Sequence, residues 1–68
     1  MADENLIFYT IEDLQNILHI GKNKAYELAN QDDFPKIKIE KHIRIPKKEF
    51  EKWLNKNLYK TYHLRKNG

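Results

Sequence analysis

Residues 10–30 read Thr-Ile-Glu-Asp-Leu-Gln-Asn-Ile-Leu-His-Ile-Gly-Lys-Asn-Lys-Ala-Tyr-Glu-Leu-Ala-Asn, and this stretch predicts two short helices joined by a tight turn. Thr10 is a favourable N-cap because its side-chain oxygen can accept a hydrogen bond from a free N–H group of the first turn. Asp13 follows three residues later and gives a short-armed capping box. The first helix is predicted over residues 11–18, with one apolar stripe made of Leu14, Ile17 and Leu18.

The second helix is predicted over residues 22–31, after His19, Ile20 and Gly21 interrupt the apolar spacing. Gly21 can adopt backbone angles that other residues avoid, and it can also cap the following helix. The side chains predicted to face inward are Ala25, Leu28 and Ala29. The outward-facing side chains are then Lys22, Asn23, Lys24, Tyr26, Glu27 and Asn30.

This outward set allows two interpretations. In a helix-turn-helix, the N-terminal residues of the second helix meet base edges in the major groove of DNA. Lysine can donate to guanine or to phosphate, and asparagine can pair with adenine through two hydrogen bonds. A polar outer face is equally normal for a helical hairpin at a protein surface. These residues alone favour neither interpretation.

Length and composition limit the possible classes of protein. The chain has 68 residues, the length of one small domain with a marginal core, so its large apolar residues are assigned to the core first. Cysteine is absent, which excludes disulfides and cysteine-based zinc sites and fits a cytoplasmic location. No apolar run approaches the length of a membrane span, and the N-terminus lacks the pattern of a signal peptide.

The charged residues are unevenly distributed along the chain, whose net charge is +3. Residues 1–35 carry two lysines against seven acidic residues, whereas residues 36–68 carry eleven basic residues against three acidic ones. The two lysines of the first half, Lys22 and Lys24, both lie on the predicted outer face of the second helix. Basic residues gathered on one surface are typical of nucleic-acid binding, although they can also serve solubility.

Residues 36–45 (Lys-Ile-Lys-Ile-Glu-Lys-His-Ile-Arg-Ile) predict a β-hairpin. A three-residue loop over 40–42 would pair the isoleucines across the strands, and all four would share one buried face: Ile37, Ile39, Ile43 and Ile45. His42 would then adopt the left-handed backbone. In this register Lys36, Lys38 and Arg44 project from the outer face and Lys41 lies at the tip, which makes a basic wing.

The flanking segments are predicted to close the core. Residues 6–9 form a short edge strand or simply cover the core, with at least Phe8 or Tyr9 buried. Phe34 is a core residue held in an extended exit by Pro35. Pro46 begins a helix over 47–58 whose apolar stripe is Phe50, Trp53, Leu54 and Leu58. Residues 59–68 are basic and aromatic, and they can extend the helix, follow a phosphate backbone, bind a protein or stay disordered.

The order of these elements resembles the excisionase family of winged helix-turn-helix DNA-binding domains, which are related to MerR-type regulators. The resemblance runs from Tyr9 to Leu54. It rests on Tyr-Thr-Ile-Glu-Asp-Leu at 9–14, Ile-Gly-Lys-Asn-Lys-Ala-Tyr-Glu-Leu at 20–28, Phe-Pro at 34–35, Arg-Ile-Pro at 44–46 and Phe-Glu-Lys-Trp-Leu at 50–54. It implies an α+β fold with a two-helix motif, a two-stranded β-hairpin wing and a C-terminal helix.

The resemblance also implies a set of DNA-binding residues. The family places its second helix in the major groove and its wing against the adjacent minor groove or backbone. The corresponding residues here are Lys22, Asn23, Lys24, Tyr26 and Glu27 on the helix, and Lys38, Lys41 and Arg44 on the wing. Two positions depart from the family pattern, because Gly21 stands where a hydroxyl residue is usual and Glu40 stands where glycine is usual.

The function implied is sequence-specific binding of double-stranded DNA by an excisionase-like accessory protein, which promotes excision of a mobile element with an integrase. Two alternatives remain: a small transcriptional regulator of the MerR-like winged-helix type, and a protein-interaction module that uses the basic tail. The predicted parts are an N-terminal arm (1–9), the DNA-binding domain (10–58) and the tail (59–68).

An enzyme is not expected, because the chain lacks cysteine and serine. The three histidines lack the spacing of metal ligands. We therefore expect no metal, no cofactor, no small-molecule substrate and no membrane partner.

Overall fold

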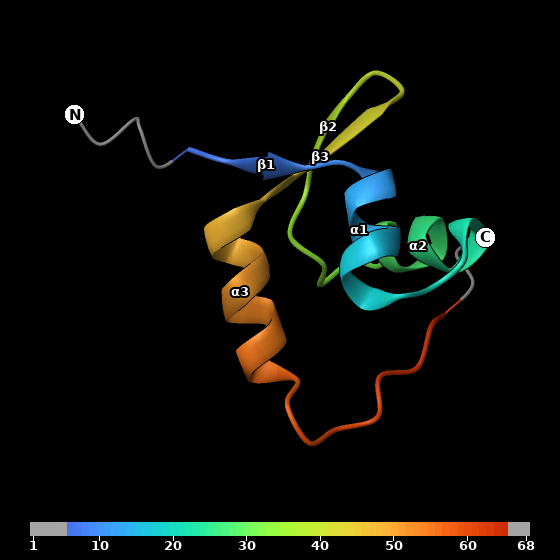
Figure 1. The fold of residues 1–68 in the computed structure, drawn as a ribbon, viewed down its shortest axis with the longest axis vertical. Coiled ribbons are helices and arrows are strands. Elements are labelled where there is room, and N and C mark those ends of the chain that lie inside the picture. The colour runs from blue at the N-terminus through green and yellow to red at the C-terminus, as the bar shows by residue number, and fades with distance from the viewer. Residues whose placement is uncertain (1–5, 66–68) are drawn as a thin grey trace.

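The computed structural model describes residues 6–65, and these form three helices and three strands (Figure 1). The order is β1 (Phe8–Tyr9), α1 (Ile11–Leu18), α2 (Lys22–Ala29), β2 (Ile37–Ile39), β3 (His42–Pro46) and α3 (Lys47–Lys56). The strands form one antiparallel sheet in the order β1-β3-β2. The β2–β3 hairpin protrudes beyond the helices, which completes the α+β winged helix-turn-helix fold predicted from the sequence. Over the described range, no helix is long and apolar enough to cross a membrane.

The α1–α2 motif begins with the predicted capping box. The Thr10 hydroxyl accepts from the Asp13 N–H at 3.2 Å, and the Asp13 carboxylate accepts from the Thr10 N–H at 2.9 Å. The turn differs from the prediction in one respect, because His19 rather than Gly21 adopts the left-handed backbone, with φ 55° and ψ 50°. Gly21 has φ −75° and is the N-cap of α2, without a side-chain cap bond. Its conformation is therefore open to any residue.

The core lies between the helices and the central strand β3. Its buried residues are Leu14, Ala25, Leu28, Ala29, Phe34, Ile43, Ile45, Phe50 and Trp53. The ring centroids of Phe34 and Trp53 lie 4.9 Å apart in an edge contact, and Phe50 stacks on Trp53 at 6.2 Å. The predicted inward faces of the second and third helices are thus confirmed for these residues.

Several apolar residues are less buried than predicted. Phe8 and Ile17 are exposed. Tyr9 is half-buried and meets the Phe50 ring edge-on at 5.8 Å. Leu58 is 54% exposed because α3 ends at Lys56, two residues before it. The prediction that the helical stripe continues to residue 58 is therefore wrong.

The hairpin register also differs from the prediction. The Cα partners are Ile37 with Arg44, Lys38 with Ile43, and Ile39 with His42. The loop therefore has two residues, Glu40 and Lys41, and the three-residue loop predicted from the isoleucine pattern is wrong. Glu40, with φ 55°, adopts the left-handed backbone that the prediction assigned to His42. This is the position where the resembled family usually carries glycine, the residue that tolerates such angles best.

This register separates the four isoleucines onto two sides of the hairpin. Ile43 and Ile45 on the central strand β3 are buried, whereas Ile37 and Ile39 on β2 are 46% and 59% exposed. Facing residues of an antiparallel pair lie on the same side of the sheet, so Lys38 shares the side of Ile43. The prediction that Lys38 and Arg44 project from one outer face is consequently wrong. The reason is that only β3 packs on the helices, while β2 is an edge strand.

Residues 60–65 fold back from the end of α3 to the end of α2 (Figure 1). We call this segment the strap. The Tyr62 ring meets Trp53 edge-on at 5.1 Å, and Leu64 also packs against the core. The described part of the tail does not extend the helix, and it packs against the core in an irregular conformation that the alternatives left open for the tail did not include.

Candidate nucleic-acid interface

The outer face of α2 presents the five side chains that the resemblance implied. Lys22, Asn23, Lys24, Tyr26 and Glu27 are all exposed, and none of these side chains has a hydrogen bond or ion pair with another residue between 6 and 65. The opposite face of the helix is buried through its alanines and Leu28, which fixes the direction of the polar face. Lys22, Asn23 and Lys24 belong to the first turn, the part of such a helix that reaches base edges.

The wing meets this face at a shared hollow. A hollow of about 250 Å³ is lined by Tyr26 of α2, by wing residues that include Lys41 and Arg44, and by Glu12 near the start of α1. Lys41 is exposed, and Arg44 is half-buried with its Nη1 donating to the Ile43 carbonyl at 3.0 Å. The fold therefore brings Tyr26 of α2 beside Lys41 and Arg44 of the wing, with Glu12 as an acidic neighbour.

Comparison with known proteins identifies this arrangement. A family model described as a helix-turn-helix domain matches residues 8–58, which is most of the chain. The chain belongs to the helix-turn-helix domain family. The match includes both helices of the motif, the wing and α3, and it ends before the strap. No curated protein and no solved structure matched the chain. Domains with this motif bind DNA through the second helix, so the protein has a DNA-binding domain.

Within the helix-turn-helix domain, the predicted wing residues are not equivalent. Lys41 and Arg44 line the hollow beside Tyr26, whereas Lys38 is exposed on the side of Ile43 and lies outside the lining of that hollow. Glu40 adds a negative charge to the tip of the wing. Basic residues therefore lie on two elements, Lys22 and Lys24 on α2 and Lys41 and Arg44 on the wing.

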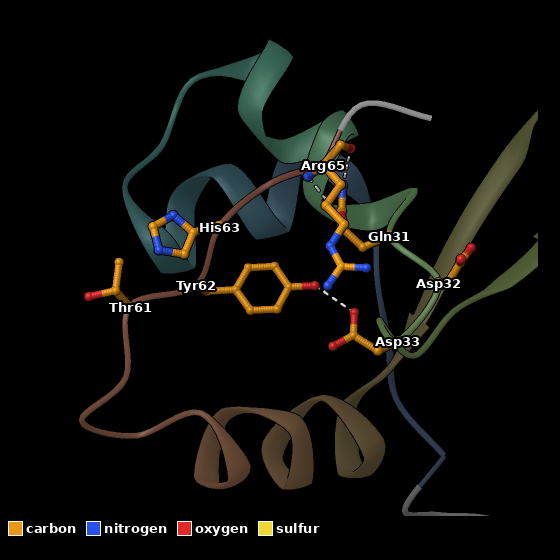
Figure 2. A pocket seen from close by; sticks show the side chains of 7 residues that line it. All are labelled: Gln31, Asp32, Asp33, Thr61, Tyr62, His63 and Arg65. Atoms are coloured by element: carbon orange, nitrogen blue, oxygen red, sulfur yellow. Dashed lines mark hydrogen bonds between the residues drawn. The ribbon is translucent and has the colours of Figure 1, made fainter. Parts of the chain in front are cut away.

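A second polar hollow lies between the strap and the segment after α2, and sequence reasoning missed its residues. It measures about 390 Å³ and is lined by Gln31, Asp32, Asp33, Thr61, Tyr62, His63 and Arg65 (Figure 2). The Tyr62 hydroxyl donates to the Asp33 carboxylate at 2.5 Å. Partial burial, that hydrogen bond and the negative charge of Asp33 raise the pKa of Tyr62 to about 12, while Arg65 opposes the shift.

Gln31 holds the strap against the helix-turn-helix domain. Its side chain is buried, with 4% exposure, and its Nε2 donates to the Arg65 carbonyl at 2.8 Å and to the Glu27 carbonyl at 2.9 Å. The Arg65 N–H donates back to Gln31 Oε1 at 3.2 Å. The partners are 34 positions apart, so no local pattern could have revealed the contact. Its role is structural, because each polar atom has a partner within the chain.

Proposed function

We propose that this protein binds double-stranded DNA sequence-specifically through α2 and the wing, and that it acts as an excisionase-like accessory protein in the excision of a mobile element by an integrase. The observation that carries the proposal is the exposed, unpaired polar face of α2, whose Tyr26 lies in one hollow with Lys41 and Arg44 of the wing. The ordered motifs shared with excisionases and the match to the helix-turn-helix family support it. The proposal implies that the protein works where DNA is present, in agreement with the predicted cytoplasmic location.

The chemistry of each α2 residue suggests its part in binding. Asn23 can pair with adenine through two hydrogen bonds, and Glu27 can accept from the amino group of cytosine. Lys22 and Lys24 can donate to guanine or to phosphate. Tyr26 lies beside Lys41 and Arg44, where its hydroxyl can donate a hydrogen bond to a phosphate of the DNA backbone. Lys38 lies on the side of the wing opposite Arg44, and we assign it a contact with a DNA phosphate.

A protein-interaction function is the second candidate, and one observation favours it. Leu58 is exposed, and Tyr59 beside it is fully exposed with φ 64°. An exposed aromatic residue in a backbone conformation that costs free energy is a feature of functional surfaces. Because Lys56 and Lys60 flank the pair, an acidic protein would be the expected partner.

The two candidates are separated by the salt dependence of binding to a random-sequence DNA duplex. Each phosphate contact releases counterions, so Lys24→Ala should weaken binding and reduce the slope of log K against log salt by about one. Lys60→Ala is the matched control, because it removes the same charge from an exposed site on the strap. Equal binding by the two variants would contradict the α2 interface, and no binding of the parent protein to DNA at low salt would favour the protein-interaction function.

Specificity is then measured by selecting preferred duplexes from a random pool. An enriched sequence that Asn23→Ala no longer distinguishes would support base reading by α2, since one bidentate pair contributes about 1–3 kcal/mol of discrimination. The position of that sequence beside a recombination site or beside a promoter distinguishes an excisionase role from a regulator.

A further inference from the structure

The outer side of the wing is apolar although no helix covers it among the described residues. Ile37 and Ile39 are both substantially exposed and lie on the protruding hairpin (Figure 1). A domain of this size has few large apolar residues to place in its core. Neighbouring exposed apolar residues can form a surface that binds a partner.

This apolar side is continuous with the hollow shared by α2 and the wing. Ile39 pairs with His42 and Ile37 pairs with Arg44, and both partners line the hollow beside Tyr26. Cross-strand neighbours on one side of a sheet have Cβ atoms about 4.5–5.5 Å apart. The two isoleucines therefore form an apolar area on the wing that adjoins the basic residues of the hollow.

We propose that Ile39, supported by Ile37, is an apolar wedge that enters the minor groove of the DNA held by α2. The inference rests on the proposed DNA-binding function and assigns a role to a side chain that has no charge. Apolar side chains inserted into the minor groove partly unstack a base step and kink the duplex. Lys41 and Arg44 provide positive charge close to the wedge, which matches the phosphates along the groove walls. Ile39 is assigned the main role because it is more exposed than Ile37 and lies next to the loop of the hairpin.

A second copy of the chain fits this surface less well. Antiparallel pairing of β2 with its own copy about a two-fold axis at Lys38 would place two lysines opposite each other. Like charges directly opposite are destabilising, and lysine on an edge strand is a common protection against such pairing. The charge of the wing therefore favours DNA as the occupant.

The test compares Ile39→Ala with Leu6→Ala, which also shortens an exposed aliphatic side chain but lies before β1. Both variants should keep the fold, as judged by circular dichroism. On a random-sequence duplex, Ile39→Ala should weaken binding about five- to tenfold through lost apolar burial, with an unchanged salt slope because no charge is removed. Energy transfer between dyes at the duplex ends should also show a smaller bend than with the parent. Leu6→Ala should match the parent in both measurements.

Three outcomes would overturn the wedge. If Ile39→Ala binds and bends DNA as the parent does while Lys24→Ala is weakened, the wedge is wrong and the α2 interface stands. If neither Ile39→Ala nor Lys24→Ala weakens DNA binding, the proposed function fails together with the wedge. If sedimentation shows that Ile39→Ala dissociates a dimer of the free protein without changing DNA binding, the apolar side is a contact between copies.

Discussion

Replacement of Gln31 by alanine tests whether the strap is an integral part of this small domain. The Gln31 side chain takes part in three hydrogen bonds, two of them with the backbone of Arg65 and one with the carbonyl of Glu27. The alanine variant removes all three and leaves backbone groups of Glu27 and Arg65 without these partners. The strap would then be held mainly by the packing of Tyr62 and Leu64.

The expected loss follows from the net value of a hydrogen bond, about 1 kcal/mol each. Three bonds give a loss of about 2–3 kcal/mol, with the lower value applying if the strap detaches and its backbone regains water. The whole domain should have a free energy of unfolding of about 3–10 kcal/mol, so the loss is a large part of it. The midpoint of thermal unfolding should fall by roughly 10–20 °C.

The assay is thermal and urea unfolding followed by the fluorescence of Trp53, the only tryptophan, whose ring contacts Tyr62 in the strap. Gln15→Ala is the matched control, because Gln15 is half-buried and its side chain has no hydrogen bond to another residue in the 6–65 range. Its effect should stay below about 0.5 kcal/mol. Trypsin should also cleave after Lys60 faster in Gln31→Ala. Equal stability of the two variants would refute the role of Gln31 in holding the strap.

Three further predictions concern single positions. Gly21→Ser should raise the free energy of unfolding by a few tenths of a kcal/mol, because a hydroxyl can cap α2 and the added Cβ meets open space; urea unfolding measures this. Glu40→Gly should stabilise by about 0.5 kcal/mol by relieving the left-handed backbone, and calorimetry would show no gain in stability if the loop were unstrained. The same variant should strengthen DNA binding by removing a negative charge, and a binding titration would show no gain if the wing tip did not approach phosphates. Tyr62 has a folded-state pKa of about 12 against an ordinary 10, so its stabilising contribution is complete below pH 10 and is lost as pH rises toward 12. The parent should therefore lose more stability over that pH range than Tyr62→Phe, and parallel losses would contradict the contact with Asp33.

The sequence was most informative where structure is decided by neighbouring residues. The capping box of Thr10 and Asp13 depends on a spacing of three residues, and it formed as predicted. The buried faces of α2 and α3 follow from helical periodicity, which placed Ala25, Phe50 and Trp53 correctly in the core. The outward direction of the polar α2 side chains followed from the same periodicity.

The errors arose where a choice depends on distant contacts. The hairpin prediction assumed that four isoleucines would all be buried, but β2 lies at the sheet edge and only β3 meets the helices. A two-residue loop with Glu40 in a left-handed conformation was therefore formed in place of the register with better apolar pairing. The strap was missed because Gln31 and Arg65 meet only after the whole chain has folded.

The interface is tested most directly by amide chemical shifts of the isotope-labelled protein as a DNA duplex is added. Binding through α2 and the wing predicts that the largest changes fall on residues 22–27 and 38–44, while residues 57–60, at the other end of the molecule from the wing tip, change little (Figure 1). Changes concentrated on residues 57–65, with α2 unaffected, would contradict it and assign DNA binding to the strap.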